Sequence, residues 1–173
     1  MGGIFMQSKH NQALVVNALI AALYVALYFV APQFAYGPIQ FRVSEGLNHL
    51  NVYHKNYKWG VVLGVFLSNF YGFMTGLGWY DIAFGTAHTL ISFLICDWIY
   101  RYLKTDKQKL AATTLVFSTM IFIIAFELNL AFELPFWATY ASLFVSEVII
   151  LALTAPLIYL INKRLNFAKM FNR

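Results

Sequence analysis

The sequence predicts an all-α membrane protein: one domain, residues 1–173, folded as a bundle of six transmembrane helices with both termini in the cytoplasm. The first observation is composition, because 61% of the residues are hydrophobic and only 11% are charged. A soluble domain is about 45–50% apolar and about 25% charged. The second observation is that long uncharged stretches alternate with loops that are either rich or poor in Lys and Arg. This pattern excludes a soluble globular protein, a disordered chain and a coiled coil.

Five of the six helices are visible as apolar stretches. A helix needs about 20 mostly apolar residues to cross about 30 Å of hydrocarbon. The first stretch lacks any charged residue from His10 to Phe41, and only Glu147 interrupts the last stretch. The expected helices are 11–31, 58–74, 81–102, 108–126 and 136–162.

The sixth helix, expected at 39–53, is short and contains Arg42 and Glu45, so hydropathy alone does not reveal it. The basic residues do, because Lys and Arg gather in the short cytoplasmic loops of membrane proteins. Basic and non-basic loops alternate along the chain only if 39–53 crosses the membrane. In that arrangement 11 of the 12 basic residues are cytoplasmic, and Arg42 is the exception.

Charge, cysteine content and missing motifs exclude several function classes. The net charge of +5 comes from basic residues in the expected cytoplasmic loops, where they would also attract anionic lipid. No nucleic-acid partner is therefore expected. The single cysteine, Cys96, excludes a disulfide framework and a cysteine-based zinc site. The chain contains no P-loop, G-x-S-x-G or H-E-x-x-H motif. We therefore expect a transport or binding subunit with no enzymatic activity, no metal and no cofactor.

Polar residues inside the expected helices are the candidate binding residues, because an ionisable group in the membrane costs about 2.5–3.5 kcal/mol on insertion scales. Counting along the helices places most of them in the outer half of the bundle. A pocket that opens to the outside fits this distribution better than a pore through the whole bundle. The candidates, with one aromatic residue at the same depth, are Arg42, Glu45, Asn69, Asp81, Glu147 and Trp79.

Each candidate also has a purely structural interpretation. Arg42 and Glu45 are three residues apart and could pair on one helix face. Asp81 stands where an acid favours a helix N-terminus, and Asn69 could bridge two helices. Glu147 is the hardest to explain structurally, because no basic residue lies within one turn of it.

Four other polar residues are interpreted as structural. His49 and His88 are expected to be hydrogen-bonded core residues. Asp97 and Arg101 are four residues apart, and we expect an ion pair near the inner membrane boundary.

Two segments resemble the signatures of a known family. The segment 36–47, YGPIQFRVSEGL, resembles the G-P-I-Q-F-R-V-S-E signature of the QueT family, and 76–85, GLGWYDIAFG, resembles its G-L-G-x-x-D-I-x-F-G signature. This resemblance implies a six-helix S component of an energy-coupling factor (ECF) transporter that imports queuosine precursors. The evenly spaced Ala18, Ala22 and Ala26 resemble the strip by which S components contact a transmembrane T subunit.

The resemblance also implies partners and a location. The chain would capture a 7-deazaguanine, such as queuine or aminomethyl-deazaguanine, outside a prokaryotic cell membrane that it crosses several times. Two cytoplasmic ATPases would hydrolyse ATP to drive uptake, and the T subunit would transmit the energy of that hydrolysis to this chain.

This class of substrate suits the polar candidates. A guanine-type edge presents two neighbouring N–H donors, which the carboxylate of Glu45 or Asp81 would accept, and Glu147 would pair with a cationic aminomethyl group. Purine-like rings stack on aromatic side chains. The candidates for donating to the O6 atom or stacking on the ring are Arg42, Asn69, Gln40, Trp79, Tyr36 and Phe41.

Three alternatives remain open at the sequence level. The chain could be an S component for a vitamin or another heterocycle. It could be a stand-alone transporter driven by protons through Glu45, Asp81 or Glu147, although six helices without an inverted repeat are few for alternating access. An intramembrane enzyme is the third alternative, and no residue spacing supports it.

Overall fold

The computed structural model describes residues 2–30, 40–74 and 78–171, and these residues form helices with no β-strand among them. The all-α prediction is confirmed. Part of the first signature, including Tyr36, lies outside the described residues. The elements are α1 (Gly2–Tyr28), η2 (Val43–Val52), α2 (Tyr57–Met74), α3 (Tyr80–Ile99), η3 (Tyr100–Tyr102), α4 (Asp106–Met120), α5 (Phe122–Phe132), α6 (Phe136–Leu165) and η4 (Phe167–Phe171), where η denotes a 3-10 helix.

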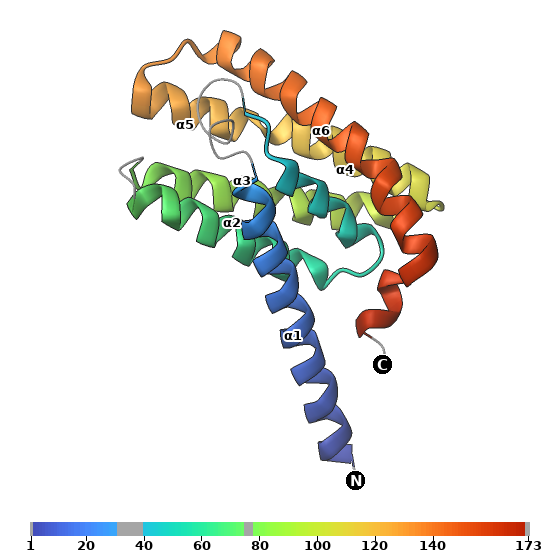
Figure 1. Cartoon of the computed structure of the whole chain (residues 1–173). Helices are drawn as coiled ribbons and strands as arrows, with labels where there is room; N and C mark the ends of the chain where they lie inside the picture. Colours follow the sequence, from blue (N-terminus) through green and yellow to red (C-terminus); the bar gives the residue numbers. More distant parts are fainter. Residues whose placement is uncertain (1, 31–39, 75–77, 172–173) are drawn as a thin grey trace.

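The helices surround the short element η2. In Figure 1, α2 and α3 lie side by side, and α4, α5 and α6 form the other part of the bundle. The element η2 packs against α1, α2, α4 and α6. The first half of α1 extends beyond the other helices (Figure 1), and Gln12 on α1 donates a hydrogen bond to the Met170 carbonyl of η4 (3.0 Å).

Four helical stretches of the described chain are long and apolar enough to cross a membrane: Asn11–Tyr28, Tyr80–Tyr102, Asp106–Phe132 and Phe136–Leu165. Helix α2 has 18 residues, or about 27 Å at 1.5 Å per residue, but Lys58 and Asn69 lower its hydropathy. The chain is therefore a multi-pass membrane protein by length and composition.

The expected helix at 108–126 is longer than predicted and bent. Helices α4 and α5 follow each other directly and meet at Ile121. Helix α5 continues to Phe132 and ends at Glu133, whose backbone is left-handed (φ 57°) and whose N–H bonds the Asn129 carbonyl. Glu127, one residue beyond the expected end of this helix, is a helical residue that is 1% exposed. The apolar run resumes after this acid, so the helix continues through it.

The expected helix at 39–53 is the 3-10 helix η2, in which nine of ten residues are buried. A 3-10 helix rises about 2.0 Å per residue, so η2 spans only about 20 Å. Irregular backbone at membrane depth is tolerated where protein surrounds it. Here the surrounding helices bury η2, and it brings polar side chains into the centre of the bundle.

Two glycines permit the close packing around η2. A Cβ atom on Gly64 of α2 would lie 2.5 Å from the Cβ atom of Tyr24 on α1. A Cβ atom on Gly46 of η2 would lie 2.7 Å from the Thr154 side chain on α6. Any larger residue at these two positions would clash. The glycines therefore allow α1 to pack closely on α2, and η2 on α6.

The expected ion pair between Asp97 and Arg101 is wrong. Asp97 on α3 instead pairs with Lys58 of α2 (2.5 Å) and accepts a hydrogen bond from Asn51 of η2 (2.9 Å). The chain tightens into η3 at Tyr100, so Arg101 leaves the α-helical spacing that would place it over Asp97. Arg101 is exposed, and the Asp97 interaction ties three elements together.

We expect Gly64→Ala to destabilise the bundle by about 1–3 kcal/mol, because overpacking a tight contact costs this much. The added methyl group would meet Tyr24. Thermal unfolding of the purified protein in detergent measures the effect, with Leu63→Ala at a half-exposed neighbouring position as the control. Equal unfolding temperatures for Gly64→Ala and the unchanged protein would contradict the close contact.

Candidate functional site

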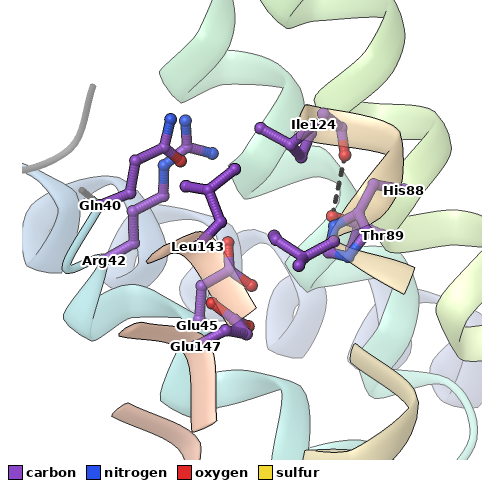
Figure 2. Close-up of a pocket in the computed structure, with 10 residues that line it drawn as sticks. Gln40, Arg42, Glu45, His88, Thr89, Ile124, Leu143 and Glu147 are labelled. Atoms are coloured by element: carbon purple, nitrogen blue, oxygen red, sulfur yellow. Dashed lines mark hydrogen bonds between the residues drawn. The ribbon is translucent and has the colours of Figure 1, made fainter. Parts of the chain in front are cut away.

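A small enclosed pocket lies where η2 faces α3, α5 and α6 (Figure 2). The space among its side chains is about 10 Å³, which is room for about one water molecule. Of the predicted site residues, Arg42, Glu45 and Glu147 line this pocket. The full lining is Gln40, Arg42, Glu45, Gly85, His88, Thr89, Ile121, Ile124, Leu143 and Glu147.

The carboxyl group of Glu45 is held from two sides. Tyr24 of α1 donates its hydroxyl to Oε1 (2.6 Å), and Asn48 donates its amide to Oε2 (2.6 Å). Glu45 is only 4% exposed, so these bonds replace the hydration that burial removes. They also orient the carboxyl group, and the pocket therefore contains an acceptor whose position is set before a ligand arrives.

Glu147 differs from Glu45 in its hydrogen bonding. Its carboxyl group lies beside that of Glu45 (Figure 2), and it is 6% exposed. Among the described residues, Glu147 Oε1 and Gln40 Nε2 have no hydrogen-bond partner. Buried polar groups are nearly always hydrogen-bonded, so this acceptor and this donor are available to a bound molecule.

Acidic side chains outnumber basic side chains around the pocket. Arg42 is 9% exposed and interacts electrostatically with Glu45 and with Asp81. Two carboxyl groups and one guanidinium group line the pocket itself. A cationic group on a ligand would therefore find a carboxyl group to pair with.

Helix α3 contributes the opposite wall. Thr89 donates its hydroxyl to the Gly85 carbonyl (3.0 Å), shown as the dashed line in Figure 2. His88 lies against the Phe117 carbonyl, with 3.2 Å between Nε2 and the oxygen. His88 is thus a hydrogen-bonded core residue, as predicted, and it also lines the pocket. His49 is buried and bonds the Leu151 carbonyl (3.0 Å), which confirms its interpretation as a core residue.

The other three predicted site residues do not line the pocket. Asn69 donates to the Asp81 backbone carbonyl (2.8 Å) and so bridges α2 and α3. Asp81 lies one turn along α3 from Gly85, and its carboxyl group interacts with that of Glu127. Trp79 is 57% exposed and stacks on Tyr80, with 4.4 Å between ring centroids.

The sequence-based candidates do not include two residues that orient Glu45, Tyr24 and Asn48. Tyr24 lies within a uniformly apolar stretch, and nothing in that stretch distinguishes its hydroxyl group from those of other tyrosines. Asn48 lies one helical turn after Glu45, and this spacing is the sequence signal that indicates a contact between the two side chains. Among the described residues there is no group of His, Cys, Asp and Glu that could hold a metal ion.

Comparison with known proteins gives a consistent match over nearly the whole chain. The sequence model of the QueT transporter family matches residues 14–163. The chain is 31% identical over 173 residues to the queuosine precursor transporter QueT of Lactococcus lactis subsp. cremoris (strain MG1363), and the alignment covers 95% of this chain and 100% of that protein. No solved structure matches the chain.

We expect Tyr24→Phe to destabilise the protein by about 1.5–3 kcal/mol, the range for a hydrogen bond to a charged group. The substitution removes one of the two donors to Glu45 and changes nothing else in shape. Tyr140→Phe is the matched control, because its hydroxyl makes a long bond of 3.3 Å at an exposed position. Similar unfolding temperatures for the two variants would show that Tyr24 does not stabilise Glu45.

Proposed function

This chain belongs to the QueT transporter family, and on that premise we propose that it is the substrate-binding S component of an ECF importer for a queuosine precursor. The observation that carries the proposal is the buried pocket in which Arg42, Glu45 and Glu147 meet. Such residues are expensive inside a membrane protein unless they serve a site. The named relative is a queuosine precursor transporter, which supports this substrate class.

The pocket has the groups that a guanine-type edge requires. Glu45, oriented by Tyr24 and Asn48, would accept the two neighbouring N–H donors of the 7-deazaguanine. Gln40 Nε2, without a partner among the described residues, would donate to the O6 atom. A ligand that lacks this edge would leave these buried groups unpaired, which costs about 1–3 kcal/mol for each group.

Glu147 would bind the substituent at position 7. The aminomethyl group of a queuosine precursor is cationic, and Glu147 Oε1 is a buried acceptor without a partner among the described residues. The surplus of carboxyl groups at the pocket favours a cationic substituent over a neutral nitrile. We therefore assign the amine-bearing precursors as the preferred substrates.

Binding would widen the pocket. The present space of about 10 Å³ is far smaller than the several hundred Å³ of a typical small-molecule site. Four elements or their flanking segments contribute to the lining. The ligand would therefore push these elements apart locally and then fill the space between them.

The proposed topology has six crossings and cytoplasmic termini in a prokaryotic plasma membrane. Eleven of the twelve basic residues are then cytoplasmic. The segment around η2 completes one crossing, although η2 itself is short.

The proposed partners are a transmembrane T subunit and two cytoplasmic ATPases. Ala18, Ala22 and Ala26 are exposed on α1, and small residues at this spacing let another helix approach closely. The ATPases are needed because the chain carries no P-loop.

A proton-coupled transporter is the second candidate function, favoured by the contact between the carboxyl groups of Asp81 and Glu127.

We expect the purified chain in detergent to bind aminomethyl-deazaguanine more tightly than the cyano form, guanine or a panel of vitamins. Isothermal calorimetry measures the affinities. Glu147→Gln should weaken binding of the aminomethyl form by at least about 30-fold, since removing one partner of a buried charge pair costs about 2–5 kcal/mol. The nitrile form should lose much less.

Glu133→Gln is the matched control, because this acid is exposed at the end of α5. Tight binding of a vitamin instead of a deazaguanine would indicate a different S component. Binding that is unchanged in both Glu45→Gln and Glu147→Gln would place the substrate outside this pocket.

We expect Ala22→Trp to leave ligand binding in detergent unchanged and to abolish uptake into cells that contain the T subunit and the ATPases. The indole ring would block a closely packed partner helix at an exposed position. Leu23→Trp, also exposed on α1, is the control. Uptake that survives ATP depletion and stops when the proton gradient collapses would favour the proton-coupled alternative.

A further inference from the structure

A second cavity lies on the outside of the bundle, between α4 and α6, and is independent of the ligand pocket. Its volume is about 530 Å³, within the range of small-molecule sites. Three alanines and a proline keep it open, because their side chains are short. The lining consists of Lys107, Leu110, Ala111, Thr114, Leu115, Ala152, Ala155, Pro156 and Tyr159.

The interior of this groove is apolar. Two lining side chains carry a hydroxyl group: Thr114, which is hydrogen-bonded to the Leu110 carbonyl (3.2 Å), and Tyr159 at one end of the groove. Water would find few partners there, since an ordered water needs two to four polar groups. Both flanking helices belong to stretches that are long and apolar enough to cross the membrane. Hydrocarbon is therefore the chemically matched occupant.

One end of the groove is basic. Lys107, near the start of α4, and Lys163, near the end of α6, both lie over the ring of Tyr159, at 6.0 and 4.8 Å from its centroid. Both lysines are exposed. The salt bridge found among the described residues joins Lys58 to Asp97, so neither ammonium group is neutralised by an acid there. Basic clefts between membrane helices attract anionic lipid headgroups.

We propose that the groove between α4 and α6 binds one anionic phospholipid, with an acyl chain along the alanines and its phosphate on Lys107 and Lys163. The apolar part of the groove matches the acyl chain of this lipid, and the basic end matches its phosphate. A zwitterionic lipid offers the same chain and no net charge, so the lysines give the site its selectivity. The groove lies on α4 and α6, whereas the alanine strip lies on α1. A partner helix docked on the alanine strip would therefore leave the groove open to lipid.

Native mass spectrometry of the full chain in detergent, titrated with phosphatidylglycerol and phosphatidylcholine of identical acyl chains, tests the proposal. We expect one phosphatidylglycerol to bind in preference. Lys107→Gln with Lys163→Gln should weaken it about thirtyfold, at about tenfold for each 1.4 kcal/mol and roughly 1 kcal/mol for each lysine. Ala152→Phe, at an exposed position that fills the groove, should remove binding of both lipids.

Lys55→Gln with Lys104→Gln removes the same charge at exposed positions outside the groove lining and should have little effect. Equal affinity for the two lipids would overturn the headgroup assignment. A preference for phosphatidylglycerol that both the lysine pair and Ala152→Phe leave intact would overturn the site itself.

Discussion

The burial of the Glu45 carboxyl group is the constraint on which the centre of this protein depends. A carboxylate removed from water is costly unless other groups replace its hydration. Tyr24 from α1 and Asn48 from η2 supply those groups. The first helix and the short 3-10 element must therefore keep a fixed relation to each other, and the pocket is organised by the same bonds.

The glycines of the neighbouring elements follow from this arrangement. Tyr24 reaches Glu45 only if α1 lies close to α2, and Gly64 leaves the space that its ring needs. Likewise Gly46 lets η2 approach α6 at Thr154, the helix that also carries Glu147. Glycine therefore occurs where two elements must approach closely to hold polar groups together inside an apolar bundle.

The molecule divides its polar and small residues among surfaces with different chemistry. At the central pocket, Glu147 Oε1 is a buried acceptor without a partner among the described residues. Small apolar residues on α1 are exposed at a spacing that permits close helix packing. Lysines without an opposing acid mark one end of the groove between α4 and α6. These surfaces therefore differ in the chemistry that they present.

The membrane class and most helix positions follow from the sequence by itself, and so do three candidates that line the pocket, because the cost of polar groups in lipid is a local property. Tertiary structure decided the rest. The form of η2, the continuation of α5 through Glu127 and the partner of Asp97 depend on neighbours distant in sequence. Asp81 and Asn69 are as polar as Glu45, yet helix packing turns Asn69 toward the Asp81 backbone carbonyl and brings the Asp81 carboxyl group to Glu127. A sequence shows which groups need compensation, and only the packed bundle decides which groups supply it.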